Sequence, residues 1–220
     1  MARALRLAHR GDWRVAPENS LAAMVAALAN PACDGHEFDV RASREGIPIL
    51  LHDDTLGRVQ GRPERPEELS VAELRAAGIP TLADVLGSAG PDPFLDVELK
   101  GEPVLQVVEV LESFRGPALP LTVVSSFEVE TLRWLAGLRP DWPRWLNTDE
   151  LTPATIRLAS DLGCRGLSVD WRSITGAGLS AAASAALEVA AWTVRLRSTA
   201  ARLERLGVVA VCVEATALDG

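Results

Sequence analysis

The feature that most limits how this 220-residue chain can fold is a regular alternation of short apolar runs with helix-like stretches. Short apolar runs bounded by turn residues are typical of buried strands, and longer periodic stretches are typical of helices. Nine extended runs can be identified, at 5–8, 36–40, 47–51, 93–100, 121–126, 143–147, 166–170, 188–194 and 208–213. Helical stretches separate most of them, which predicts parallel strands joined by helical crossovers.

One pair of runs breaks this alternation, because only about six residues separate 36–40 from 47–51. Parallel strands need a crossover of about a dozen residues or more, so the second run must return antiparallel. The turn signal Ser43-Arg44-Glu45-Gly46 supports a short hairpin over about 36–52. Eight strands remain, which predicts one (β/α)8 TIM barrel domain over residues 1–220, with the hairpin at its mouth. A doubly wound open sheet is the alternative.

Composition and charge exclude several classes of protein. A formal net charge of −8 argues against a nucleic-acid partner, because phosphate backbones are bound by basic surfaces. Cys33, Cys164 and Cys212 form no C-x-x-C pair, which predicts buried thiols rather than a disulfide framework or a zinc site. No apolar run approaches the ~18 residues that a membrane helix needs. We expect no signal peptide, because the run at 5–8 leaves no room before it for a basic region, an apolar core and a cleavage site. A cytoplasmic protein without a membrane span is therefore expected.

Three carboxylates are expected to meet at the mouth of the barrel. Glu37 and Asp39 are two residues apart, so their side chains project from the same face of one strand. Glu98 lies near the end of the next parallel strand, and the C-terminal ends of barrel strands meet at one mouth. A set of oxygen ligands without a thiolate suits a hard divalent cation, Mg²⁺ or Ca²⁺. The alternative is an ion-pair cluster with Arg10 and Lys100.

Two of the three histidines are expected at the same mouth. His9 ends the first strand, and the hairpin carries His52 back towards the carboxylates. Imidazoles titrate near neutrality, so a facing pair can take a proton from a nucleophile and give one to a leaving group. His36 lies on the opposite strand face from Glu37 and is expected to be structural.

Basic residues beside such a site, together with a metal and an acid–base pair, predict hydrolysis of an anionic phosphate ester. A cation together with Arg10 and Lys100 could stabilise the charge on phosphoryl oxygens, and no covalent nucleophile is needed. Lys100 is the only lysine among 22 basic residues. Its presence in an arginine-rich chain suggests that this position requires a compact point charge rather than a planar guanidinium.

A series of motifs resembles the glycerophosphodiester phosphodiesterase family over nearly the whole chain. The motifs are His9-Arg10-Gly11, Pro17-Glu18-Asn19-Ser20, Glu37-Phe38-Asp39-Val40, Ser43-x-x-Gly46, His52-Asp53, Glu98-Leu99-Lys100 and Ala191-Trp192-Thr193-Val194. The resemblance implies a barrel, a divalent metal held by Glu37, Asp39 and Glu98, and a His9/His52 acid–base pair. It also implies cleavage of glycerophosphodiesters to glycerol 3-phosphate and an alcohol, through a cyclic phosphate formed by the glycerol hydroxyl.

The chain departs from the family pattern at several positions. Val59-Gln60-Gly61 replaces a threonine-rich stretch, Arg195 replaces the usual asparagine, and Glu214 lies where a Thr-Asp pair is common. These changes are expected to affect the substrate rim, and hence the alcohol preference, rather than the metal or the histidines. Trp192 is expected to line the substrate pocket, with barrel packing as its alternative role, and Trp13 is expected to pack.

Two other functions remain open from the sequence. A lysophospholipase D acting on larger lipids would need an apolar groove at the mouth, which the short 53–97 segment offers little material to build. A non-catalytic barrel that binds phosphodiesters is the other alternative, and the complete set of three carboxylates and two histidines argues against it.

Overall fold

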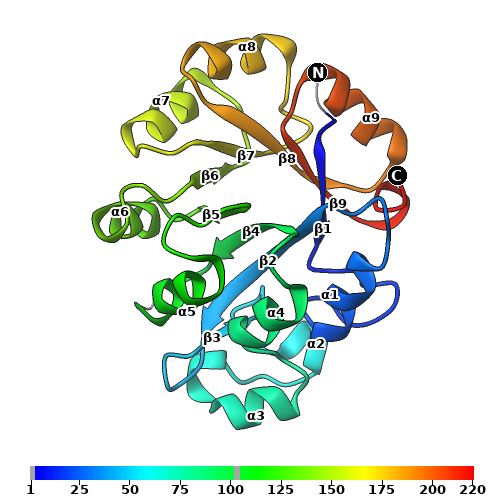
Figure 1. Cartoon of the computed structure of the whole chain (residues 1–220), viewed down its shortest axis with the longest axis vertical. Helices are drawn as coiled ribbons and strands as arrows, with labels where there is room; N and C mark the ends of the chain where they lie inside the picture. Colours follow the sequence, from blue (N-terminus) through cyan, green and yellow to red (C-terminus); the bar gives the residue numbers. More distant parts are fainter. Residues whose placement is uncertain (1–2, 102–104) are drawn as a thin grey trace.

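A computed structural model describes residues 3–101 and 105–220 of the chain and shows a closed parallel barrel (Figure 1). Its strands are β1 (Leu5–His9), β2 (Gly35–Ala42), β4 (Phe94–Leu99), β5 (Thr122–Ser126), β6 (Arg144–Thr148), β7 (Gly166–Asp170), β8 (Glu188–Val194) and β9 (Ala210–Val213). Each strand pairs in parallel with the next, and β1 pairs with both β2 and β9. The predicted (β/α)8 barrel is confirmed, and the open sheet is wrong because the β1–β9 pairing closes the ring.

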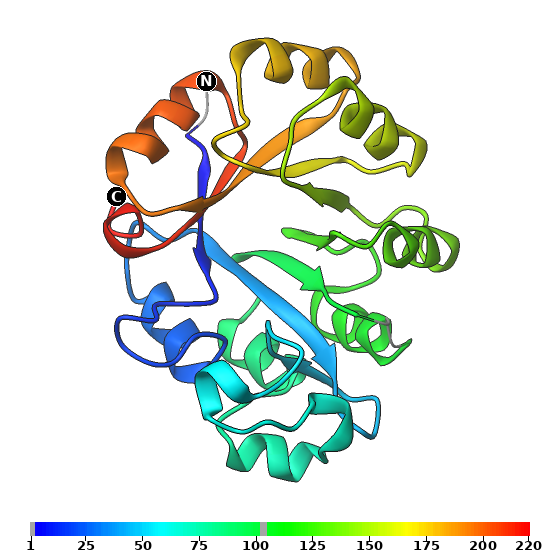
Figure 2. The same cartoon turned by 180° about the vertical axis from the view of Figure 1, so that it is seen from behind.

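Helices surround the strands on the outside (Figures 1 and 2). They are α1 (Leu21–Leu28), α4 (Leu82–Ala89), α5 (Leu105–Arg115), α6 (Val129–Leu138), α7 (Pro153–Asp161), α8 (Gly176–Ser184) and α9 (Arg197–Leu206). Ser20 caps α1 by accepting from the Ala23 amide, and Thr81 caps α4 by accepting from the Asp84 amide. Among the described residues, no helix combines the length and the apolar character that crossing a membrane requires.

The segment between β2 and β4 forms an additional layer at one side of the barrel (Figure 1). β3 (Pro48–Leu50) runs antiparallel to the end of β2, with Val40 opposite Leu50. Within 64–77 the chain forms a 3-10 turn (Pro66–Glu68) and then α3 (Val71–Ala76). α2 (Gly57–Gln60) has one turn, too short to produce a periodic pattern in the sequence.

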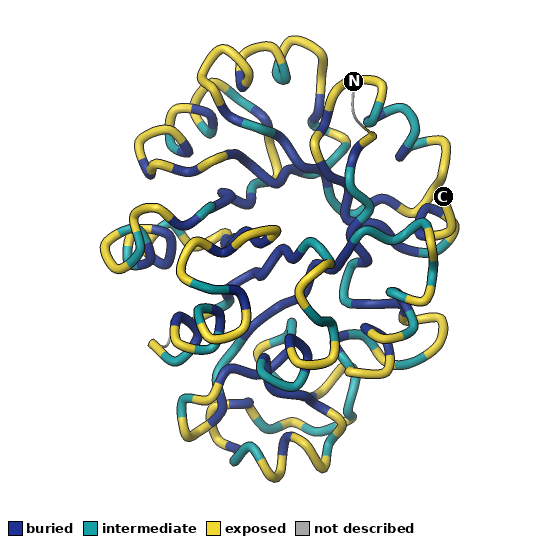
Figure 3. The backbone as a smooth tube through the Cα atoms, viewed as in Figure 1, coloured by how far each residue is buried: buried dark blue, intermediate teal, exposed yellow. Residues whose placement is uncertain are grey.

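The two faces of β2 and β4 differ as strand alternation requires. Phe38 and Val97 point outwards into an apolar core shared with α4 and α5. Glu37, Asp96 and Glu98 point into the barrel, where they line a pocket. The strands are buried while the outer surfaces of the helices are exposed (Figure 3). The inward carboxylates of these two strands therefore face the pocket in the barrel interior.

Apolar side chains fill the other end of the barrel interior. Trp145 is fully buried there and stacks on Phe94 with 6.0 Å between ring centroids. Gly35 begins β2 at this level because a Cβ would lie 1.8 Å from the Phe94 carbonyl oxygen. A packed floor beneath a polar mouth is the arrangement expected of a barrel whose site lies at the C-terminal ends of its strands.

Candidate active site

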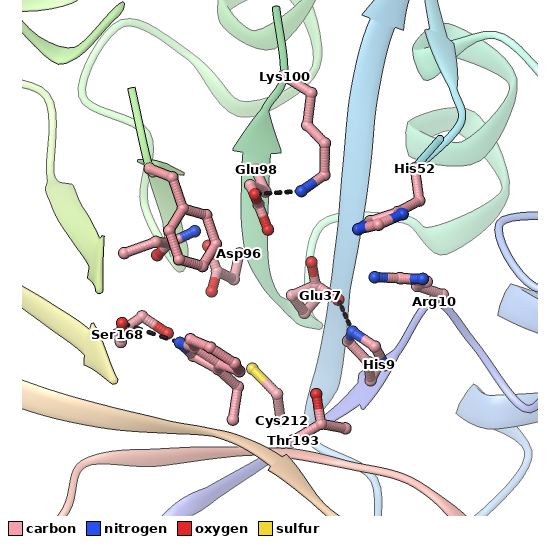
Figure 4. A pocket seen from close by; sticks show the side chains of 13 residues that line it. His9, Arg10, Glu37, His52, Asp96, Glu98, Lys100, Ser168, Thr193 and Cys212 are labelled. Atoms are coloured by element: carbon pink, nitrogen blue, oxygen red, sulfur yellow. Dashed lines mark hydrogen bonds and ion pairs between the residues drawn. The ribbon is translucent and has the colours of Figure 1, made fainter. Parts of the chain in front are cut away.

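A pocket opens at the C-terminal ends of the barrel strands (Figure 4). It is lined by His9, Arg10, Glu37, His52, Asp96, Glu98, Lys100, Phe127, Asn147, Ser168, Trp192, Thr193 and Cys212. Seven of the eight candidate residues from the sequence line it. Asp39, the eighth, is fully buried and pairs with Arg10 and Lys100. The structure thus brings all the candidates together, although they come from segments far apart in the chain.

The carboxylates of Glu37, Asp39 and Glu98 form a cluster in which one oxygen of each lies within 4.8 Å of the others. The strand register produces this arrangement, because Asp39 on β2 is directly opposite Glu98 on β4. All three side chains are buried. This carboxylate cluster therefore concentrates three buried acidic groups in one part of the site.

Both basic candidates pair with the carboxylate cluster. Arg10 Nε lies 2.9 Å from Asp39 Oδ2, and Lys100 Nζ lies 3.2 Å from Asp39 Oδ1 and also contacts Glu98. Arg10 additionally donates to Glu18 Oε1 at 3.0 Å. The ion pairs that the sequence offers as an alternative to a metal are therefore present, and they do not exclude one.

The positive charges around the cluster do not fully offset the burial of its carboxylates and the repulsion between them. Burial raises the pKa of Glu37 well above its ordinary value, and repulsion from Asp39 and Glu98 adds to the effect. Burial and the Asp39 charge likewise raise the pKa of Glu98 to about 7. Burial also opposes ionisation of Asp39, but Arg10 and Lys100 outweigh it and hold its pKa at about 2. A dication would stabilise the ionised form of all three.

The residues present fit a hard divalent cation. The three donors are carboxylate oxygens, which Mg²⁺ and Ca²⁺ prefer. Glu37 Oε2 is buried and accepts no hydrogen bond from the described residues, so this oxygen is available as a ligand. A neutral ligand would leave the surplus negative charge uncompensated, and a metal that prefers thiolates finds no sulfur among these three donors.

The two histidines of the pocket share one arrangement. His9 Nδ1 lies 2.5 Å from Glu214 Oε1, and His52 Nδ1 lies 2.7 Å from Asp53 Oδ1. His9 Nε2 faces Glu37 Oε2 at 3.7 Å, and Figure 4 shows His9 and His52 on the same side of Glu37 with Arg10 between them. Because an ionised carboxylate only accepts, each Nδ1 is the donor and each Nε2 is left for chemistry.

His36 is separate from this site, as strand alternation predicts. It is buried under α1 and α4, where it lines a small cavity with Met24 and Val85. Burial lowers the pKa of His36 to about 4, and the Arg115 charge adds to the effect. A neutral imidazole in the helix-facing layer cannot take part in proton transfer at the mouth.

The expected role of Glu214, one of the departures from the family pattern, is wrong. Glu214 was expected at the substrate rim, but it contacts His9 directly, and Arg195 Nε donates to its other oxygen at 2.8 Å. The strand-end rule that selects His9 would also have selected Glu214, because it follows β9 immediately. The sequence also predicts no role for Asp53 or for its ion-pair partner Arg58, although Asp53 adjoins His52 in the chain.

Two aromatic side chains, Trp192 and Phe127, also line the pocket. Trp192 donates a hydrogen bond through Nε1 to the Ser168 carbonyl at 2.9 Å. Its ring is T-shaped against the Phe127 ring, with 5.6 Å between the ring centroids. Lys100 Nζ lies 5.7 Å from the centroid of the Phe127 ring. Trp13, by contrast, was expected to pack and is 45% exposed. Of the three cysteines, Cys164 and Cys212 are buried and Cys33 is half-buried.

Comparisons of the sequence with known proteins identify the same family. The sequence model of the Glycerophosphoryl diester phosphodiesterase family matches residues 9–218. A glycerophosphodiester phosphodiesterase from Caldanaerobacter subterraneus subsp. tengcongensis is 28% identical over 156 residues, which are 62% of this chain and 63% of that protein. Human glycerophosphodiester phosphodiesterase 1 is 41% identical over 69 residues, which are 31% of this chain and 20% of that protein.

Solved structures agree with this result. A phosphodiesterase from Oleispira antarctica, in complex with the product sn-glycerol-3-phosphate, is similar with a TM-score of 0.83 and 27% identity. The match covers 96% of this chain and 93% of that one. The two curated relatives named above align over shorter regions, and the alignments cover 63% and 20% of their own length, less than two thirds in both cases.

Proposed function

The chain belongs to the glycerophosphoryl diester phosphodiesterase family, and from this we propose that it hydrolyses glycerophosphodiesters to glycerol 3-phosphate and an alcohol. The observation that carries the proposal is the convergence of the carboxylate cluster and both histidines on one pocket. Neither group alone would distinguish an enzyme from a binding protein. Together they supply charge stabilisation and proton transfer at the same point.

Glu37, Asp39 and Glu98 would hold the divalent cation, Mg²⁺ or Ca²⁺. When bound, the cation supplies charge stabilisation for the phosphoryl oxygens. Arg10 and Lys100 contact Asp39 of this cluster and also line the pocket. Their guanidinium and ammonium groups would contact the substrate phosphate, with Trp192 as a neighbouring wall.

His9 and His52 would carry the protons. One imidazole accepts the proton of the glycerol hydroxyl as its oxygen attacks phosphorus, and the other donates a proton to the departing alcohol oxygen. Water then opens the cyclic phosphate with the two roles reversed, so every proton taken up is returned. The carboxylates at Nδ1 of each ring support this assignment, because they hold both Nε2 atoms towards the pocket.

Release of glycerol 3-phosphate from glycerophosphocholine tests the proposal. We expect glycerol 3-phosphate and choline in the presence of Mg²⁺ or Ca²⁺, and neither in excess chelator. Tight binding of the diester without turnover under any metal would instead support a non-catalytic barrel. Release of phosphocholine and glycerol would mean that the wrong ester bond is cleaved. The expected cytoplasmic location and single-domain organisation stay predictions.

A second candidate function is favoured by one observation. A partly apolar groove adjoins the active-site pocket at His52 and is lined in part by Leu21, Leu51, Val59 and Ile79. The 53–97 segment thus supplies more of an apolar surface than its length suggested. A groove of this kind could hold the acyl chain of a lysophospholipid, so lysophosphatidylcholine belongs in the same assay. Faster turnover of it than of glycerophosphocholine would select the lysophospholipase D function.

Lys100→Arg is expected to lower kcat/KM by roughly 10- to 100-fold, the value of one or two charge-assisted hydrogen bonds. The Lys100 side chain is 12% exposed, and its ammonium group lies between Asp39, Glu98 and the Phe127 ring, which leaves little space for a planar guanidinium. Steady-state kinetics measure the loss, and thermal unfolding should show little change. A fully active Lys100→Arg variant would return this residue to a structural role.

A further inference from the structure

The strongest unassigned feature of the site is the carboxylate behind His9. Glu214 follows β9 and His9 ends β1, and these strands pair with Ala8 opposite Val213. The side chains of His9 and Glu214 are 14% and 8% exposed, and Glu214 Oε1 lies 2.5 Å from His9 Nδ1. Barrel closure therefore delivers a buried carboxylate to the ring nitrogen that faces away from the pocket.

We propose that Glu214, held in place by Arg195, is a positioning residue that fixes the orientation and tautomer of His9. The inference rests on the proposed function, since it concerns the use of His9 in proton transfer. A carboxylate that accepts from Nδ1–H leaves the Nε2 lone pair directed into the pocket. It also stabilises the imidazolium that forms when Nε2 takes a proton. Without it, the ring could rotate or carry its proton on the working nitrogen.

Arg195 occupies the second oxygen of Glu214. Its Nε donates to Oε2 at 2.8 Å, so each carboxylate oxygen has one partner. Burial acts to raise the pKa of Glu214, but the hydrogen bonds from His9 and Arg195 outweigh it and hold the pKa below its ordinary value. The backbone reinforces the pair, because the Glu214 amide donates to the Val194 carbonyl at 2.9 Å. Glu214 is thus an ionised acceptor with a fixed position.

The other histidine of the pocket has the same arrangement. Asp53 accepts from His52 Nδ1 with one oxygen, and Arg58 Nε donates to its second oxygen at 2.6 Å. Asp53 and Arg58 come from the segment after β3, on a different side of the barrel from β8 and β9. An ion pair that only joined two loops would not need to reproduce a histidine–carboxylate–arginine order at both imidazoles. The repetition points to a role in proton transfer.

Kinetics of Glu214 variants test the proposal. Glu214→Gln keeps the shape and removes the charge, and we expect kcat to fall by on the order of 10- to 100-fold with KM changed less than about twofold. Glu214→Asp should recover part of the rate, and Arg195→Ala should lose less than Glu214→Gln. Asp170→Asn is the matched control, because Asp170 ends β7 and pairs with Arg172, and no histidine is among its hydrogen-bond or ion-pair partners in the described part of the chain. A Glu214→Gln variant as active as this control would overturn the proposal.

A spectroscopic readout separates positioning from general stability. The chain has three histidines, so long-range ¹H–¹⁵N spectra of ¹⁵N-histidine-labelled protein with Mg²⁺ can be assigned with single-histidine variants. We expect His9 to carry its proton on Nδ1 in the wild type and to lose this fixed tautomer in Glu214→Gln. An unchanged His9 signal in that variant would contradict the inference. If the wild type released no glycerol 3-phosphate, the proposed function would fail, while this spectrum would still decide whether Glu214 orients His9.

Discussion

Glu98→Gln is expected to lower metal-dependent turnover by at least about 100-fold, since outer-shell partners of a metal site alone are worth about 10- to 100-fold. The amide keeps the size of the side chain but removes one charge from a cluster whose oxygens lie within 4.8 Å of each other. Calorimetric titration of the variant with Mg²⁺ or Ca²⁺ should show weaker binding, and kinetics should show the corresponding loss of rate.

Asp96→Asn is the matched comparison for that variant. Asp96 lies two residues earlier on the same inward face of β4, and burial raises its pKa to about 7, as it does for Glu98. It is not part of the carboxylate cluster, and it accepts a hydrogen bond from Ser125 at 2.6 Å. Metal affinity should therefore survive in Asp96→Asn. Equal loss of affinity in both variants would mean that the metal assignment is wrong.

Replacement of His9 or His52 by alanine should lower kcat by on the order of 10²- to 10⁴-fold, the usual value of general acid–base catalysis. His36→Ala is the control, since this buried ring lines a cavity under α1 and α4 and lies outside the active-site pocket. Its loss should reduce the free energy of unfolding, with little effect on kcat at a temperature where the protein stays folded. Equal effects of the three substitutions on kcat would contradict the assignment of roles by strand face.

Local rules account for most of what the sequence could predict. The period of two in β2 and β4 places Glu37, Asp39 and Glu98 on the inner face and His36 on the outer one. The C-terminal ends of parallel barrel strands all lie at one end of the barrel, so His9 at the end of β1 reaches the same mouth. These conclusions need only the order of the strands and their directions. Fold and candidate site could therefore be predicted together.

Features that depend on closure of the barrel or on side-chain packing could not be predicted from these local rules. The contact between His9 and Glu214 joins residues 205 positions apart, and it exists because β9 pairs with β1. The groove beside His52 depends on how α2 and α3 pack, and α2 has a single turn without a periodic signal. The exposure of Trp13 likewise depends on how its loop lies on the barrel, which composition does not determine.

The central claim is that a divalent cation at the carboxylate cluster enables cleavage of a glycerophosphodiester at this barrel mouth. A ³¹P NMR time course of glycerophosphocholine with the wild-type protein tests it most directly, first in excess chelator and then after Mg²⁺ or Ca²⁺ is added to the same sample. We predict that the diester signal stays constant with chelator and converts to glycerol 3-phosphate when the metal is in excess. Conversion at the same rate in chelator, or a diester that persists with either metal, would contradict the account.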